Sequence, residues 1–143
     1  MGDIVWTINP ENDQFEKIIL RMKSFAFDLL GAKNINFHFI ADDRVSQINL
    51  PMEVRKNLYL IFKEATNNLV KYSGADNAYF SIKEEDKYLS MMIKDNGKGF
   101  DPGIETPGNG LKNMQKRADE IGAKLIVMSA PGKGTNIQLK IAV

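Results

Sequence analysis

Apolar residues recur at helical spacing along three stretches of the chain. Between residues 15 and 30 and between residues 51 and 73 they fall three or four positions apart, which places them on one face of a helix. The second stretch opens with a proline, a residue favoured in a first helical turn, and is followed by Gly74, a typical helix end. Residues 111–121 repeat the pattern. The sequence therefore predicts three amphipathic helices.

Other stretches alternate in polarity and are rich in β-branched and aromatic residues. The predicted strands are residues 35–40, 77–83, 88–94, 123–129 and 135–143. Short turns join the second to the third and the fourth to the fifth, so both pairs are predicted hairpins. The order of elements is α-β-α-β-β-α-β-β. We therefore predict an α/β (α+β) fold, a two-layer α/β sandwich whose mixed, mostly antiparallel sheet carries the helices on one face.

The composition narrows the class of protein. A chain of 143 residues with 43% hydrophobic content suits one domain with a sizeable core. Nineteen basic and eighteen acidic residues leave a formal net charge of +1, so we expect no nucleic-acid partner held by a broad basic surface. The sequence contains no cysteine, which excludes disulfides and thiolate metal sites. Its apolar runs are too short to span a bilayer.

Five of the eleven glycines fall between residues 97 and 110. Asp95, Gly97 and Gly99 follow a predicted strand, where glycines let the backbone approach a ligand and leave the carboxylate pointing into the gap. A carboxylate accepts hydrogen bonds from an exocyclic amine such as that of adenine. Gly108 and Gly110 precede a predicted helix, whose first N–H groups form an anion site suited to phosphates. These features indicate a nucleotide site; ordinary turn glycines would explain the flexibility but not Asp95 or the paired spacing.

The second predicted helix carries a polar row on one face. Glu64, Asn68 and Lys71 lie at positions i, i+4 and i+7, one turn apart. A carboxylate beside an amide oxygen suits Mg²⁺, which takes few protein oxygens and keeps waters or phosphate oxygens for the rest. A solvated stripe of ordinary polar residues is the commoner explanation of such a row, because polar stripes are the rule on surface helices. A phosphate loop of the G-x-x-x-x-G-K-[ST] type is absent from the sequence, so any nucleotide is held by another scaffold.

Four segments in the same order resemble the ATP-binding domain of sensor histidine kinases, part of the superfamily shared with gyrase, the ninety-kilodalton heat-shock chaperone and mismatch-repair proteins. They are "FKEATNNLVKYSGA", "DNGKGFD", "GNGLKNMQKRADEIGA" and "GKGTNIQLKI". The third segment matches the kinase subgroup whose lid helix reads G-x-G-L-x-N-M-x-x-R-A. The resemblance covers about residues 50 to 143 and implies a Bergerat-type ATP-binding fold with ATP and Mg²⁺ as cofactors.

The resemblance also implies roles for single residues. Asn68 would hold Mg²⁺, and Glu64 would order water or polarise the attacking group. Asp95 would bind the adenine amine, and Lys71 would neutralise phosphate charge. The remaining binding residues would be Gly97 and Gly99 beside the base and ribose, Gly108, Gly110 and Leu111 at the phosphate-facing lid hinge, and Thr135 near the adenine. Tyr72 departs from the pattern, since the family often has histidine there.

A histidine kinase needs an acceptor histidine on an upstream helix, and the sequence contains only His38, which lies in a predicted strand. The resemblance implies that residues 1–30 are a connecting helix from a dimerisation and phosphoacceptor region outside this sequence, and residues 31–143 the catalytic domain. The partners it implies are those helices and a response regulator. The parent kinase would be a membrane-anchored homodimer with this domain in the cytoplasm. The fragment alone is expected to bind ATP without autophosphorylation.

Three functions therefore remain open. The first is the catalytic domain of a sensor histidine kinase, which moves the ATP γ-phosphoryl group to a histidine for relay in a two-component system. The second is a stand-alone protein serine kinase of the anti-sigma-factor type. The resemblance of residues 1–30 to a connecting helix argues against this second function. The third is a non-catalytic module that binds ATP to change the shape of a partner.

Overall fold

The structure is a computed structural model that describes residues 15–101 and 110–143. The described helices are α2 (Phe15–Gly31), α3 (Met52–Asn68) and α4 (Gly110–Glu120), with a 3-10 turn η1 (Asp43–Gln47) and a π-helical turn η2 (Leu69–Ser73). The described strands are β1 (Asn36–Ala41), β2 (Asn77–Glu85), β3 (Tyr88–Asp95), β4 (Lys124–Ser129) and β5 (Thr135–Ala142). Every predicted helix and strand is present.

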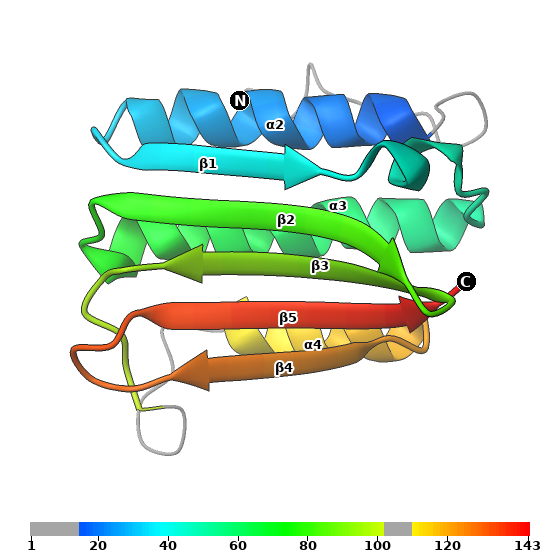
Figure 1. Cartoon of the computed structure of the whole chain (residues 1–143). Coiled ribbons are helices and arrows are strands. Elements are labelled where there is room, and N and C mark those ends of the chain that lie inside the picture. Colours follow the sequence, from blue (N-terminus) through cyan, green and yellow to red (C-terminus); the bar gives the residue numbers. More distant parts are fainter. Residues whose placement is uncertain (1–14, 102–109) are drawn as a thin grey trace.

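The strands form one mixed sheet in the order β1-β2-β3-β5-β4 (Figure 1). Strand β1 runs parallel to β2, and every other neighbouring pair is antiparallel. In the register of the three central strands, Asp95 pairs with Ala78 on one side and with Thr135 on the other. The last residue of β3 therefore lies directly beside the first residue of β5, although forty positions of sequence separate them.

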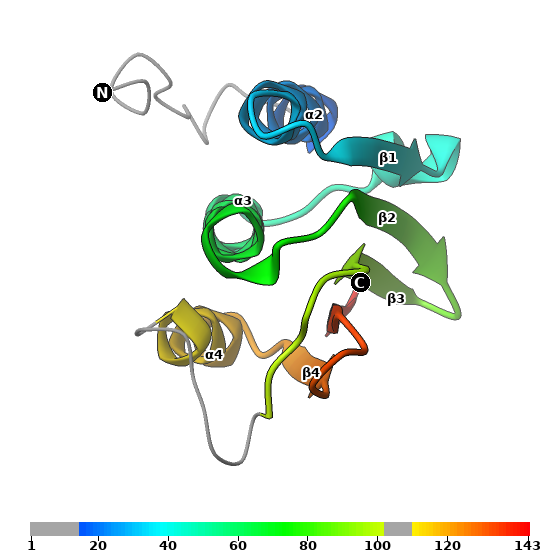
Figure 2. The ribbon, with the colours of Figure 1, turned by 90° about the vertical axis from the view of Figure 1, so that its left-hand side faces the viewer.

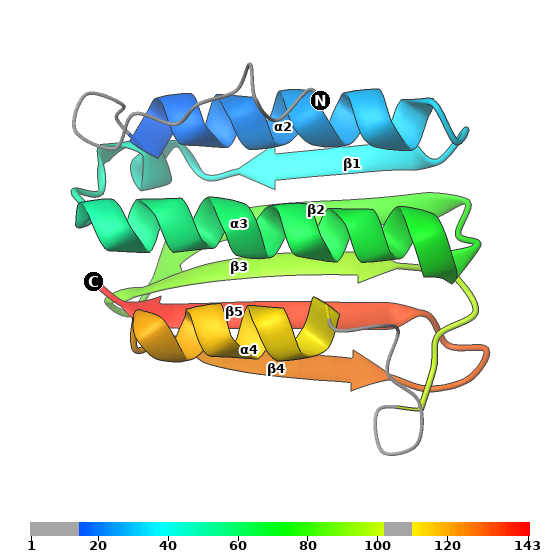
Figure 3. The same cartoon turned by 180° about the vertical axis from the view of Figure 1, so that it is seen from behind.

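The helices of the described part of the chain all cover one face of the sheet, and none of them lies on the opposite face (Figures 2 and 3). Alternate residues of the central strands point toward the helices, as the burial of Phe80, Ile82 and Met91 shows. Phe80 meets Phe62 of α3 edge to face, with ring centroids 5.0 Å apart. The prediction of a two-layer sandwich with a mostly antiparallel sheet is confirmed.

Helix α2 packs against the same hydrophobic core as α3 and the sheet. Its buried residues are Phe15, Ile18, Ile19, Met22, Ala26 and Leu30. Burial of a phenylalanine, isoleucine, methionine or leucine side chain stabilises the folded state by roughly 1.5–3 kcal/mol relative to its exposure, so α2 contributes substantially to the stability of the domain. Among residues 15–101 and 110–143, no helix combines the length and the apolar character needed to cross a membrane.

Two local features differ from the prediction. The helix expected to run from Pro51 to Ser73 changes at Leu69 into the π-helical turn η2, and Gly74 ends it with a φ of 62°. The β2–β3 hairpin turns at Asp86 and Lys87, whose φ values of 52° and 68° are both positive. Such two-residue turns match the twist of antiparallel strands, and β2 therefore continues to Glu85, two residues beyond its predicted end at 83.

Candidate functional site

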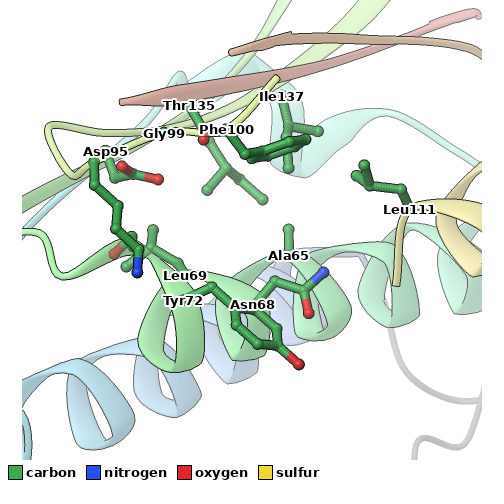
Figure 4. A pocket seen from close by; sticks show the side chains of 13 residues that line it. Ala65, Asn68, Leu69, Tyr72, Asp95, Gly99, Phe100, Leu111, Thr135 and Ile137 are labelled. Atoms are coloured by element: carbon green, nitrogen blue, oxygen red, sulfur yellow. The ribbon is translucent and has the colours of Figure 1, made fainter. Parts of the chain in front are cut away.

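A cavity of about 210 Å³ lies between α3, the last residues of β3, the first residues of β5 and the start of α4. This is below the usual range of about 300–1,000 Å³ for whole-ligand sites, so the described walls would enclose one part of a ligand. Figure 4 shows Ala65 and Asn68 on the helix facing Thr135 and Ile137 from the sheet, with Leu111 at the end. The lining residues are Ala65, Asn68, Leu69, Tyr72, Ser73, Ile93, Asp95, Lys98, Gly99, Phe100, Leu111, Thr135 and Ile137.

Asp95 is the buried acid of this cavity, with 5% of its surface exposed. The backbone N–H of Gly97 donates to Oδ1 over 2.8 Å, and the backbone of Thr135 also hydrogen-bonds to the carboxylate. Burial raises the pKa of Asp95, and the hydrogen bonds from Gly97 and Thr135 act in the opposite direction. The carboxylate is thus held in place by the backbone at the edge of an apolar slot, where it can accept from a ligand donor.

The glycines after Asp95 allow close approach of three chain segments. A methyl group on Gly97 would lie 2.2 Å from the carbonyl oxygen of Ser73, and the next residue, Lys98, donates its N–H to that same oxygen over 2.8 Å. Gly99 has a φ of 64°, and a methyl group there would meet the Ala130 carbonyl oxygen at 2.2 Å. Gly99 lines the cavity, whereas Gly97 is not among its lining residues and packs against the end of η2.

Asn68 is the last residue of α3 and faces the cavity, directly before the π-helical turn. π-Helical turns are rare in regular helices, and those that occur are often found at functional sites. Its Nδ2 atom is buried and has no hydrogen-bond partner within the described part of the chain. A methyl group on Gly110 would lie 2.2 Å from that nitrogen. The nitrogen therefore faces α4, which leaves the amide oxygen as the group available to a ligand.

The remaining predicted residues divide by position. Leu111 and Thr135 line the cavity, and Gly110 is buried behind Asn68. Glu64 and Lys71 are not among the lining residues; Glu64 is half-buried on α3 and Lys71 is exposed on η2. Gly108 lies outside the described residues. The structure thus brings three of the four adenine-side candidates, all but Gly97, and Asn68 around one space.

Several residues at this site were not singled out from the sequence. The Oδ1 atom of Asn96 accepts hydrogen bonds from the backbone N–H groups of Asp76 and Asn77, over 3.0 and 2.9 Å, and so anchors the segment after Asp95 to the start of β2. Ser129 joins the β4–β5 turn to the cavity wall. A small hydroxyl or amide residue beside a tight turn is the only signal available in sequence, and it is common to many turns.

The cavity combines apolar walls with the polar side chains of Asp95, Thr135 and Asn68. Ile93 and Ile137 from the sheet and Ala65 and Leu69 from the helix supply the walls. A flat aromatic ring buries its faces well in such a slot, and its edge finds the Asp95 carboxylate. The Asn68 oxygen offers a ligand suited to a hard cation such as Mg²⁺. The residues present therefore fit a nucleotide with its metal.

The family model described as histidine kinase-, DNA gyrase B- and HSP90-like ATPase matches residues 53–143. The chain belongs to this family. Curated relatives include the sensor protein VraS of Staphylococcus aureus strain COL, 37% identical over 98 residues, which cover 67% of this chain and 28% of that protein. VraS of Staphylococcus haemolyticus is 34% identical over 121 residues, 83% of this chain and 33% of that protein. The chain thus spans about a third of the length of these relatives.

Solved structures with the same fold include the histidine kinase domain of a blue-light activated kinase from Erythrobacter litoralis, with a TM-score of 0.73 and 17% identity over 87% of this chain and 60% of that one. The catalytic domain of histidine kinase ThkA has a TM-score of 0.70 and 15% identity over 91% and 94% of the two chains. Full-length ShkA, solved with AMPPNP, has a TM-score of 0.68 and 16% identity over 90% and 31%. The predicted resemblance to histidine kinase ATP-binding domains is confirmed at the level of family and fold.

Proposed function

We propose that this chain is the ATP-binding catalytic domain of a sensor histidine kinase. In this proposal it positions ATP so that the γ-phosphoryl group passes to a histidine on a helix outside this sequence, for relay to a response regulator. The single observation that carries the proposal is the buried Asp95 carboxylate at the edge of an apolar slot, in a chain of this ATPase family. A buried carboxylate is costly unless a partner compensates it, and an exocyclic amine is such a partner.

The proposal assigns each candidate residue a task. Asp95 accepts from the adenine amine, and Thr135 adds a hydroxyl at the same end of the cavity. The Asn68 oxygen binds Mg²⁺, and the metal supplies charge neutralisation to the phosphates when bound. Outside the described lining, Glu64 orders water or polarises the attacking group, and Lys71 offsets phosphate charge. The glycine positions are Gly97 and Gly99 at the base and ribose and Gly108 and Gly110, with Leu111, at the phosphates.

The wider setting is also part of the proposal. Residues 1–30 would join the domain to dimerisation and phosphoacceptor helices, with α2 packed on the domain core as described. The parent kinase would be a homodimer anchored in a membrane, with this domain on the cytoplasmic side. Its partners would be those helices and a response regulator.

Nucleotide binding is tested by calorimetry on the chain as it stands. We expect ATP to bind in the presence of Mg²⁺ and Asp95→Asn to abolish detectable heat, because the amide oxygen stays with the Gly97 N–H and the NH₂ group then presents a donor to the adenine amine. Asp28→Asn, an exposed acid on α2, is the matched control and should bind normally. Asn68→Ala should remove the benefit of Mg²⁺, whereas Asn67→Ala, its neighbour outside the cavity lining, should keep it. Equal affinity in Asp95→Asn and the unchanged chain would refute the proposal.

Phosphoryl transfer is tested with labelled ATP. The chain alone should take up no label, since its single histidine, His38, lies on strand β1 and not on a helix, with its ring stacked on Tyr79 at a centroid distance of 4.8 Å. Addition of a helical fragment bearing an acceptor histidine should produce acid-labile label on that fragment. Acid-stable label on an added protein would instead identify a serine kinase. ATP binding without transfer to any acceptor would favour the non-catalytic module.

A further inference from the structure

Ser129, the last residue of β4, joins three parts of the cavity wall through one hydroxyl group. The backbone N–H of Phe100 donates to its Oγ over 2.9 Å. The Oγ lies 3.0 Å from the Gly134 carbonyl oxygen and 2.9 Å from Oγ1 of Thr135. Phe100 and Thr135 both line the cavity, whereas Ser129 is not among the lining residues and acts from behind them.

The direction of each hydrogen bond follows from counting protons. A serine hydroxyl has one proton to donate and two lone pairs that accept. The Gly134 carbonyl can only accept, so it takes the Ser129 proton. The Phe100 N–H can only donate, so it occupies one lone pair. The second lone pair then takes the Thr135 hydroxyl proton, which resolves the one bond whose direction the distances leave open.

The consequence lies at the cavity. Because the Thr135 proton is committed to Ser129, its oxygen presents only lone pairs to a ligand. Thr135 sits beside Asp95 in the β3–β5 register, and its backbone hydrogen-bonds to that carboxylate. The two side chains therefore offer acceptors at the same end of the cavity. At its 6-position a 6-amino purine presents a hydrogen-bond donor, whereas a 6-oxo purine presents an acceptor at that position.

We propose that Ser129 is a positioning residue that sets base specificity by holding the Thr135 hydroxyl as an acceptor, so that the site favours a 6-aminopurine nucleotide over its 6-oxo counterpart. The inference rests on the proposed nucleotide-binding function and extends it. Without Ser129, the Thr135 hydroxyl would be free to rotate and donate to a 6-oxo group. Discrimination would then fall even where the carboxylate is intact.

The experiment compares Mg²⁺-ATP with Mg²⁺-inosine triphosphate, which has oxygen in place of the 6-amino group. The measured quantity is the Kd for inosine triphosphate divided by the Kd for ATP, both determined by calorimetry, so a lower ratio means a weaker preference for ATP. In Ser129→Ala we expect the preference for ATP to fall by about tenfold, the usual effect of relieving one unmatched buried hydrogen-bonding group. Ser90→Ala, a half-buried serine on β3 outside the cavity lining, is the matched control and should leave the ratio unchanged.

A double-mutant cycle separates positioning from general loosening of the wall. Thr135→Val removes the acceptor and should itself lower the ratio, and Ser129→Ala should then have no further effect on it. Should Ser129→Ala fail to fold, Thr135→Val carries the test alone. An unchanged ratio in either single variant overturns the inference, as does an equal fall caused by Ser129→Ala in the Thr135→Val background. Failure of the unchanged chain to bind ATP at all would instead refute the proposed function.

Discussion

The amide of Asn68 packs directly against the backbone of Gly110. A methyl group at Gly110 would lie 3.0 Å from Oδ1 and 2.2 Å from Nδ2, and the second distance is closer than such atoms approach one another in folded proteins. The Asn68 amide thus occupies the space that a side chain at position 110 would need. Only glycine at position 110 leaves room for this amide.

This relationship predicts a sign change in a mutant cycle. In the unchanged chain, Gly110→Ala should lower the free energy of unfolding by about 1–2 kcal/mol, because the overpacked amide must move. In the Asn68→Ala background the same substitution should stabilise by about 0.5–1 kcal/mol, since alanine is the better helix former. Urea unfolding of the four proteins measures both effects. An identical effect in the two backgrounds would show that the amide and the glycine are independent.

The turn between β4 and β5 offers a matched pair of glycines. Gly132 and Gly134 have φ values of 79° and 73°, but a methyl group on Gly132 meets open space whereas one on Gly134 would lie 2.2 Å from the Asp95 carbonyl oxygen. Gly132→Ala should cost only the backbone strain, about 1–2 kcal/mol. Gly134→Ala adds a clash with backbone and should cost about 1–3 kcal/mol more, as measured by urea unfolding. Equal losses would mean that the turn moves away from β3 freely.

Asn96 should stabilise the segment that carries Asp95. Asn96→Ala removes the acceptor of two backbone N–H groups and should lower the free energy of unfolding by about 1–2 kcal/mol. ATP affinity should fall with it, because Asp95 precedes the loosened residue. Asn96→Asp keeps an acceptor for both N–H groups and is the control, with stability and affinity close to those of the unchanged chain. Loss of affinity in Asn96→Asp equal to that in Asn96→Ala would assign the effect to the amide nitrogen instead.

Asp95 should make the stability of the unliganded chain depend on pH in a specific direction. Burial raises its pKa above the ordinary value of 3.8, so the folded state binds a proton at a higher pH than the unfolded state does. This contribution to stability is therefore present at low pH and is lost as the pH rises from 3.8 through the raised pKa. Asp95→Asn removes the ionising group.

Thermal unfolding across a pH series measures this effect. The stability of Asp95→Asn relative to the unchanged chain should increase as the pH rises from about 3 to 7, over the range in which an aspartate of raised pKa ionises. A stability difference that shrinks with rising pH would contradict the assigned direction.

Much of the fold could be predicted from the sequence because its signals are local. Helical spacing located α2, α3 and α4, and alternation located all five strands to within a few residues. The π-helical turn after Asn68 could not be predicted, because Leu69 to Ser73 continue the same apolar stripe and only their packing distinguishes the wider turn. The hairpin between β2 and β3 was predicted, but Asp86 and Lys87 adopt positive φ without a glycine, so the sequence did not show that its turn is only two residues long.

The candidate site divides in the same way. Asp95, Asn68 and Thr135 were predicted from motifs, and all three line the cavity. That Glu64 orders water or polarises the attacking group, and that Lys71 neutralises phosphate charge, stay predictions. Ser129 and Asn96 were not found from sequence because their partners lie far along the chain: Phe100 is 29 positions from Ser129, and Asn77 is 19 positions from Asn96.

The sequence by itself determined the class of fold, the family and the residues that form one end of the site, since these depend on periodicity and on short motifs. The tertiary structure alone decided which polar groups are buried, which way each hydroxyl donates and where a glycine is required by a neighbour. These properties depend on the register of β3 against β5 and on the approach of α4 to α3. Contacts between distant segments set both, and spacing along one chain does not record them.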